Sequence, residues 1–117
     1  MLVLLRFDVS AEELPGFLER ARVAIEVLGE RPGFLRGQVA QALDQAGLMV
    51  VELEFVDVGS YRRALSSSDV KMRAVRFLSG AVDEASAFEV LHERTATSVT
   101  DSPSSLAPDH DTFGIGD

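Results

Sequence analysis

The chain of 117 residues contains no cysteine, no tryptophan and no asparagine, and it has a single tyrosine. Without cysteine there is no disulfide, no thiolate nucleophile and no cysteine-ligated metal. Basic residues are also scarce, with 11 Lys and Arg against 19 Asp and Glu and a formal net charge of −8. Nucleic acid and anionic lipid bind basic surfaces, so we expect neither a nucleic-acid partner nor a membrane partner.

Long apolar runs are missing as well. The first five residues are apolar, but they lack the basic start of a signal peptide, and Arg6 and Asp8 follow at once. No run is long enough to span a bilayer. We therefore expect a cytoplasmic protein whose first residues form a strand.

A change in composition near residue 96 predicts one folded domain over residues 1–96 and a flexible tail over residues 97–117. The tail holds four aspartates and no Lys or Arg, and it is rich in Ser, Thr and Pro. Such a segment buries too little apolar surface to offset its ordering entropy, so we expect disorder in solution. The alternative is that its apolar residues, Leu106, Phe113 and Ile115, dock on a partner.

The spacing of apolar residues predicts four strands and two helical regions. Alternation indicates strands over residues 2–9, 34–43, 48–56 and 86–95. A helix is expected to open at Ser10, with Glu13 completing a capping box, and to stop at Gly29. The second helical region contains a short helix over residues 60–65 and a longer one, capped by Asp69, that ends near Asp83.

This order is βαββαβ, an α+β ferredoxin-like fold with a four-stranded antiparallel sheet and both helices on one face. The other face mixes apolar with charged residues, namely Leu2, Leu4, Leu48, Val50, Val56, Arg6, Glu52 and Glu54. Apolar area of that kind predicts a face-to-face homodimer. We expect Arg6, Glu52 and Glu54 at the interface, with Arg6 or Arg36 neutralising the two glutamates.

Several stretches resemble the antibiotic biosynthesis monooxygenase-like (ABM) family of the dimeric α/β barrel superfamily. They are RPGFLRG at 31–37, VELEF at 51–55, SYRRAL at 60–65, SSDVK at 67–71 and ASAFEVL at 85–91. The resemblance covers roughly residues 2–95 and implies a homodimer in which two sheets close a barrel. Oxygenase members of the family oxidise electron-rich aromatic substrates without a metal or flavin, in a pocket between the sheet and the helices.

The chain departs from the family's pocket at several positions. Phe55 stands where the family often has Trp, and Phe7 occupies the position where haem-degrading relatives have Asn. The family's helix histidine is missing too. Tyr61 matches the tyrosine of some phenol-oxidising members, and a family arginine falls near Arg73 or Arg76. The resemblance therefore disfavours haem degradation and leaves phenol oxidation open.

An oxygenase of this kind binds an acidic phenol, helps to deprotonate it and stabilises the anion. We expect Tyr61 to bond a substrate oxygen, and Arg73 or Arg76 to hold a phenolate or carboxylate. The other reading makes the phenylalanines core and the arginines a solvated helix face. The expected pocket-lining residues are Phe7, Val51, Leu53, Phe55 and Phe77.

No metal site and no cofactor are expected. His92, the only histidine within residues 1–96, has no partner at metal or triad spacing. His110 lies in an Asp-His-Asp run that makes a weak and nonspecific ligand set.

The leading hypothesis is a cofactor-independent monooxygenase that acts on a small aromatic substrate, a phenol, a quinol or a polyketide-like molecule. A non-catalytic dimeric small-molecule-binding or accessory protein of the same fold is the alternative, favoured by the missing Trp, Asn and helix His. A purely structural dimer, with its phenylalanines filling the cavity, is the third.

Overall fold

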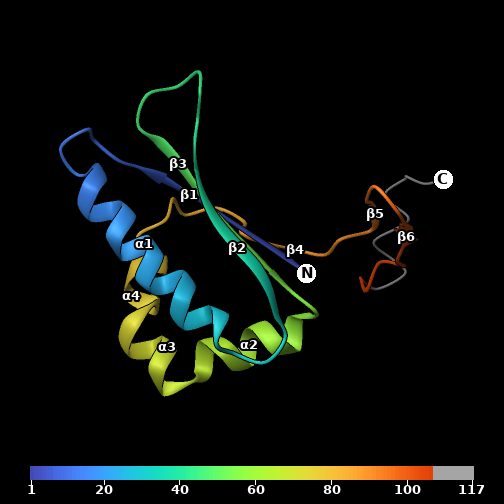
Figure 1. Ribbon diagram of the computed structural model, residues 1–117. Helices are drawn as coiled ribbons and strands as arrows, with labels where there is room; N and C mark the ends of the chain where they lie inside the picture. The colour runs from blue at the N-terminus through green and yellow to red at the C-terminus, as the bar shows by residue number, and fades with distance from the viewer. Residues whose placement is uncertain (107–117) are drawn as a thin grey trace.

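The computed structural model describes residues 1–106, so His110, Phe113 and Ile115 lie outside the described residues. The sheet is four-stranded and antiparallel, with strand order β2-β3-β1-β4, and the helices cover one of its faces (Figure 1). The predicted α+β, ferredoxin-like arrangement is confirmed. The strands are β1 (Leu2–Asp8), β2 (Phe34–Gln41), β3 (Leu48–Phe55) and β4 (Ala87–Phe88), and the helices are α1 (Leu14–Gly29), α2 (Val58–Ser66), α3 (Ser68–Arg73) and α4 (Val75–Leu78).

The core forms between the sheet and α1. Burial alternates along β3, where Met49, Val51, Leu53 and Phe55 face inward. Small residues such as Ala21 of α1 let the helix lie close to the sheet, and Ala21 is fully buried. Burying a Val, Leu or Phe side chain fully contributes about 1.5–3 kcal/mol, so the inward row of β3 is a substantial part of the core.

Helix α1 begins later than the sequence predicts. Ser10 and Glu13 do form the predicted capping box, because the Ser10 N–H donates to Glu13 Oε1 at 3.1 Å and the Glu13 N–H donates to Ser10 Oγ at 3.2 Å. The residues between them make a turn, and the helix starts at Leu14 with Pro15 in its opening turn. Proline is tolerated there because its missing N–H has no intrahelical partner.

The second helical region differs from the prediction in two ways: another residue caps the longer helix, and that helix is divided in two. Ser67, not Asp69, caps α3 by accepting the Val70 N–H at 3.3 Å. The predicted single helix to residue 82 is wrong, because Ala74 leaves helical geometry (φ −131°, ψ −37°) and separates α3 from α4. Ala74 is buried. The interruption therefore lies at a position that is packed in the core.

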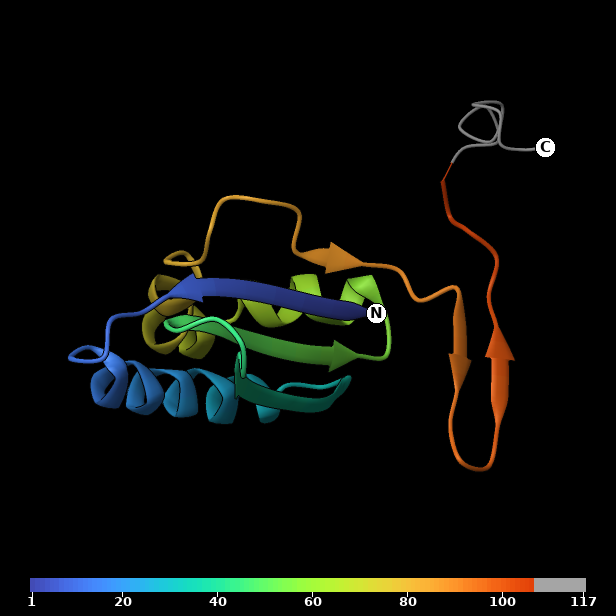
Figure 2. The ribbon, with the colours of Figure 1, turned by 90° about the horizontal axis from the view of Figure 1, so that it is seen from above.

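The last strand is much shorter than predicted. Only Ala87–Phe88 pairs with β1, and the chain then leaves the sheet. Residues His92–Arg94 (β5) instead pair with Val99–Asp101 (β6) in a separate hairpin, which stands away from the domain (Figure 2). Strand β6 lies within the segment expected to be a flexible tail. The domain division at residue 96 stays a prediction. No helix within residues 1–106 has the length and apolarity needed to cross a membrane.

The junction between β3 and α2 depends on Gly33. Its backbone has φ +89°, and a Cβ at this position would lie 2.4 Å from Ser60 Oγ. Ser60 is buried, and its N–H donates to Asp57 Oδ1 at 2.7 Å, which caps α2 and lowers the pKa of Asp57. The Gly33 carbonyl accepts the Val56 N–H at 2.8 Å. The turn after α1 and the start of α2 therefore hold each other in place.

Replacing Gly33→Ala is expected to lower the free energy of unfolding by about 2 kcal/mol or more, because it adds both a strained backbone and a clash with Ser60. Urea denaturation measures the change. Gly59→Ala is the matched control: the added Cβ would lie 3.1 Å from the end of the long Arg63 side chain and at an ordinary contact distance of 3.6 Å from Asp57 Oδ1, and alanine favours the helix. Equal losses for the two variants would contradict this account of the junction.

Candidate functional site

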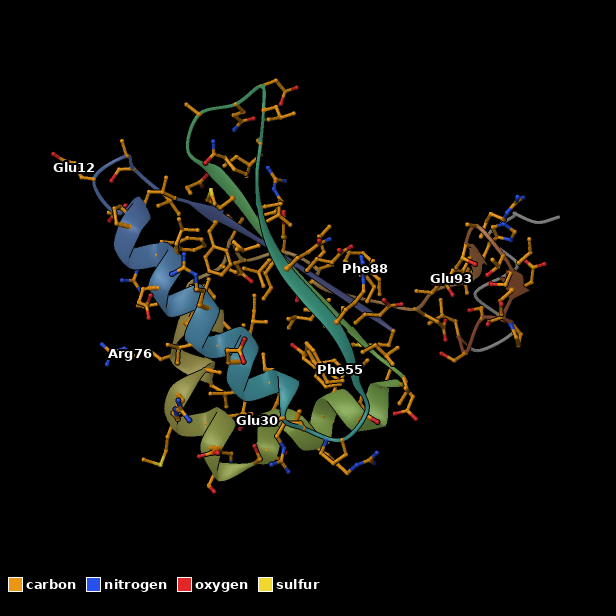
Figure 3. All side chains as sticks on the ribbon, viewed as in Figure 1. Glu12, Glu30, Phe55, Arg76, Phe88 and Glu93 are labelled. Carbon is orange, nitrogen blue, oxygen red and sulfur yellow. The ribbon has the colours of Figure 1, made fainter. Side chains whose placement is uncertain are left out.

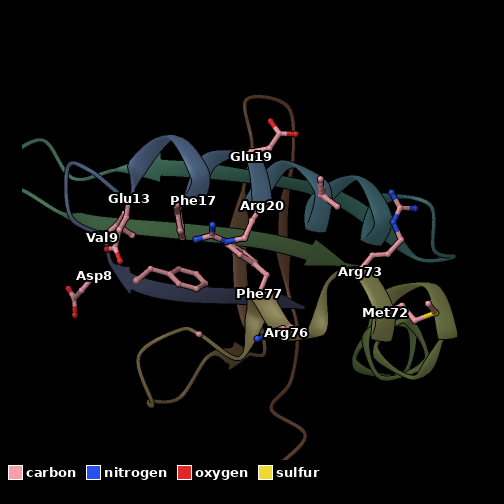
Figure 4. A pocket seen from close by; sticks show the side chains of 13 residues that line it. Asp8, Val9, Glu13, Phe17, Glu19, Arg20, Met72, Arg73, Arg76 and Phe77 are labelled. Atoms are coloured by element: carbon pink, nitrogen blue, oxygen red, sulfur yellow. The ribbon is translucent and has the colours of Figure 1, made fainter.

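A pocket of about 540 Å³ lies between α1, the end of β1 and the helices α3 and α4 (Figure 4). This volume is within the range of small-molecule sites. One side of the pocket is aromatic, and charged side chains surround its mouth. The lining residues are Phe7, Asp8, Val9, Glu13, Phe17, Glu19, Arg20, Val23, Met72, Arg73, Arg76, Phe77 and Gly80.

Three phenylalanines from three elements form the aromatic side. Phe7 of β1 stacks on Phe77 of α4 with ring centroids 5.0 Å apart, and Phe17 of α1 meets Phe7 edge-on, also at 5.0 Å. The third pair, Phe17 and Phe77, is separated by 5.3 Å. Phe7 and Phe17 are buried, whereas Phe77 is half-buried. The cluster thus presents a firm apolar surface on which an aromatic ligand can stack.

Three arginines reach the same pocket from three helices. Arg20 comes from α1, Arg73 from α3, and Arg76 from α4. Figure 4 shows Arg20 and Arg76 on either side of Phe77, and Arg73 further along, near Met72. All three are exposed. Within residues 1–106, no carboxylate oxygen lies within 4.0 Å of any of their guanidinium nitrogens.

The acidic residues of the pocket are engaged elsewhere or lie at its other end. Glu13 accepts the Ser10 N–H, which lowers the pKa of its carboxyl, and Glu19 pairs with Arg22 at 3.1 Å. Figure 4 shows Asp8 and Glu13 together near Val9, with the Glu19 carboxylate directed outward. The pocket therefore has an acidic end and a basic end.

Of the residues predicted from the sequence, Phe7, Phe77, Arg73 and Arg76 come together in this pocket. Val51 and Leu53, predicted as lining, are fully buried core residues, and neither lines this pocket nor a second hollow of about 350 Å³. Both residues therefore contribute to the core.

Phe55 and Tyr61 belong to a different cluster. Phe55 is fully buried, with Phe34 at 5.4 Å and Tyr61 at 5.3 Å between ring centroids, and it borders the second hollow. Tyr61 is half-buried, and burial raises the pKa of its hydroxyl. Figure 3 shows Phe55 near α2 and Arg76 on the opposite side of the helical layer. Tyr61 does not line the arginine-containing pocket.

Neither Arg20 nor Phe17 was among the site residues predicted from the sequence. The two residues are three positions apart, so they lie on one face of the helix. This spacing could have indicated the site from the sequence, because it places an arginine one turn away from a large aromatic residue on a helix that packs on the sheet.

The interface candidates lie on the sheet face away from the helices. Arg36 Nη2 lies 3.0 Å from Glu52 Oε1, and Arg36 Nε lies 3.2 Å from Glu54 Oε1. Of the two arginines proposed to neutralise these glutamates, Arg36 does so. Arg6 instead lies 3.7 Å from Glu84.

The histidine within residues 1–96 lies far from the pocket. His92 contacts Asp101 across the exposed β5–β6 hairpin. In the part of the chain that the structure describes, no three His, Asp or Glu side chains gather as a set that could hold a metal ion.

Comparison with solved structures places the fold among known ones. It is similar to a conserved protein from Methanosarcina mazei Go1 (TM-score 0.59, 22% identity, covering 74% of this chain and 84% of that one). It is also similar to SnoaB, a cofactor-independent oxygenase from Streptomyces nogalater (TM-score 0.59, 19% identity, 83% and 96% covered). A protein of Pseudomonas aeruginosa gives a TM-score of 0.56 at 10% identity, with 76% and 92% covered. At these sequence identities the similarity to the three structures shows a shared fold.

No curated protein matches the sequence. Residues 1–75, well over half of the chain, match the family of antibiotic biosynthesis monooxygenases. The stretches that suggested the resemblance from the sequence lie largely within this range. The protein belongs to the antibiotic biosynthesis monooxygenase family.

Proposed function

We propose that the protein is a cofactor-independent monooxygenase that oxidises a small aromatic phenol or quinol in the pocket beside Phe7, Phe17 and Phe77. The observation that carries the proposal is this stacked aromatic wall, which borders a cavity of about 540 Å³ in a member of a monooxygenase family. SnoaB, a similar structure, is a cofactor-independent oxygenase.

The chemistry balances without an outside reductant. A phenol with a free para C–H supplies the electrons: one atom of O₂ becomes the new quinone oxygen, and the other leaves as water with the two hydrogens of the substrate. The protein must bind the ring, assist loss of the phenol proton and stabilise the anion. The phenylalanine wall binds the ring, and Arg73 and Arg76 supply positive charge beside it.

We assign the anion-stabilising role to the arginines and not to Tyr61. The Tyr61 ring packs on Phe55, and Tyr61 is not among the residues that line the pocket of Phe77 and the arginines. Its contribution in this proposal is to packing.

A non-catalytic binding protein is the second candidate. The chain has no Trp or Asn, and the helix position that carries histidine in many relatives falls near Ala64. These absences remove polar groups that oxygenase members use, but they leave the cavity intact. Tight binding of aromatics with no oxygen uptake would favour this candidate.

Oxygen consumption with a panel of hydroquinones and naphthols tests the enzymatic proposal. Phe77→Leu, which keeps apolar volume but removes the stacked ring, is expected to lower kcat/KM by about tenfold, since an aromatic pair contributes roughly 0.5–1.5 kcal/mol. Phe34→Leu is the control, because it removes a half-buried ring that packs on Phe55 outside the pocket. Equal kinetic losses in both variants would count against the assigned site, and no turnover of any substrate would overturn the enzymatic proposal.

Tyr61 is the only tyrosine in a chain without Trp, so tyrosinate absorbance reports on it alone. Burial raises its pKa above the ordinary value of about 10. The hydroxyl of Tyr61 is expected to have a higher pKa in the folded protein than in the protein unfolded in urea. Because folding raises the pKa of Tyr61, the neutral tyrosine contributes fully to the free energy of unfolding at pH values below its pKa in the unfolded protein. This contribution is lost as the pH rises through the pKa of Tyr61 in the folded protein. Binding of 2-naphthoate, which does not ionise in this pH range, should leave the pKa of Tyr61 unchanged, and a ligand-induced change would place Tyr61 at the bound ligand.

We also propose that the protein is a homodimer that associates through the sheet face opposite the helices. Leu2, Leu4, Leu48 and Val50 are only partly covered there, and Phe88 is 42% exposed. Arg36, Glu52 and Glu54 form an ion-pair cluster on this face. Such a cluster sets the geometry of an interface more than it adds stability.

Sedimentation of Glu54→Gln tests the homodimer. The variant leaves Arg36 with fewer partners, so association is expected to weaken several-fold and to lose part of its dependence on salt and pH. Glu26→Gln, on exposed α1 surface, is the control. Association of Glu54→Gln that matches the wild type across salt and pH would contradict the proposed interface.

A further inference from the structure

We propose that the pocket beside Phe77 binds an aromatic carboxylate, with the ring on the phenylalanine wall and the carboxylate held by Arg20 and Arg76, with Arg73 adding positive charge further along. The inference rests on the proposed function in one respect: it takes the bound aromatic carboxylate to be the substrate of the monooxygenase. The binding site itself follows from the arrangement of charge in the pocket, and binding measurements test it without turnover.

The arginines of this pocket differ from several others in the chain. Arg22 and Arg36 each lie within 3.2 Å of a carboxylate oxygen, as side-chain pairs on the protein surface commonly do. Within residues 1–106, the guanidinium groups of Arg20, Arg73 and Arg76 have neither a carboxylate within 4.0 Å nor a side-chain hydrogen bond within the protein. Their planar donor sets remain available to a ligand, and they match the two oxygens of a carboxylate.

Within residues 1–106 no carboxylate pairs with Arg20, Arg73 or Arg76, although the pKa of Glu13 is lowered by its hydrogen bonds with Ser10 and, in addition, by the charge of Arg20. Glu19 is held by Arg22 and points outward, and Glu13 is held by the Ser10 N–H at the far end of the pocket (Figure 4). Asp8 lies beside Glu13. An elongated aromatic acid would therefore find positive charge at one end, an apolar wall in the middle and hydrogen-bond acceptors for a hydroxyl at the other end.

The ligand's charge separates a carboxylate from a plain phenol. A phenol ionises with a pKa near 10, so most of it is neutral at pH 7, and the arginines attract it fully only once its proton has been lost. A carboxylic acid is fully ionised at that pH and experiences the whole attraction. The three arginines therefore increase the affinity for an aromatic acid much more than the affinity for a neutral phenol.

The lining also argues against a more highly charged group. It contains three arginines and three carboxylates, namely Asp8, Glu13 and Glu19. The three carboxylates repel a phosphate, which carries close to two negative charges at neutral pH, more strongly than they repel a carboxylate. The planar guanidinium groups also match the two oxygens of a carboxylate.

Titration calorimetry with 2-naphthoate, 2-naphthol and 2-naphthyl phosphate tests the proposal, because the three probes share one ring system. 2-Naphthoate is expected to bind at least tenfold more tightly than 2-naphthol at low salt, and to weaken as salt is added. Arg20→Gln combined with Arg76→Gln should lower naphthoate affinity about tenfold and leave naphthol affinity within about twofold. Both arginines are exposed, so the double variant should keep the fold, which circular dichroism checks.

Arg62→Gln is the matched control, because Arg62 is exposed on α2 and lines neither hollow. It removes one positive charge without touching the pocket and should leave naphthoate affinity unchanged. Equal binding of naphthoate and naphthol, tighter binding of the phosphate, loss of naphthoate affinity with Arg62→Gln equal to that of the double variant, or no binding of naphthoate would each overturn the proposal.

The two proposals fail separately. Naphthoate binding that depends on Arg20 and Arg76, in a protein that consumes no oxygen with any aromatic substrate, would retain the carboxylate site and overturn the monooxygenase. Turnover of neutral naphthols with no preference for a carboxylate would retain the monooxygenase and overturn the carboxylate site.

Discussion

Leu5 of β1 lies opposite Val51 of β3, and this antiparallel pairing decides which side chains enter the core. Side chains alternate along a strand, so one register turns the apolar rows of both strands toward the helices together. A slip of β1 by one residue against β3 would turn Arg6 inward in place of Leu5. Helix α1 packs on the resulting surface, and the charged and partly apolar residues of the other face are left for a partner. The layers, the core and the open face all follow from this pairing.

The same pairing sets one wall of the candidate site. It brings Phe7 to the end of β1, beneath α1 and α4, where the ring meets Phe77. The interruption at Ala74 completes the pocket, because Arg73 ends one helix and Arg76 belongs to the next. In one continuous helix these two arginines would lie side by side on a single face. With the interruption, they approach the pocket at different points, and Arg20 reaches it from α1.

The pocket combines a wall of three packed phenylalanine rings with three arginines that have no carboxylate within 4.0 Å in residues 1–106. The protein carries a net charge of −8, yet three guanidinium groups within the described residues point to one cavity without a carboxylate beside them. In a pocket with few neutral donors, charge is the main means of recognising a polar group. The monooxygenase proposal and the inference about the ligand therefore use the same phenylalanine surface. They differ in the group that the arginines bind, which is a phenolate in the first and a carboxylate in the second.

Local patterns in the sequence determined the strands of the sheet, the capping box at Ser10 and the family, because period-two alternation and short cap motifs are set by neighbouring residues. They also identified Phe7, Phe77 and the arginines of the second helical region as candidates. Only the tertiary structure separated Tyr61 from these residues, interrupted the helix at Ala74, ended β4 at Phe88 and brought Arg20 into the pocket. Those outcomes depend on how α1 and the later helices pack on one sheet. Contacts between segments far apart in the chain leave no periodic signal in either segment, so the packed structure alone decides which residues face a cavity.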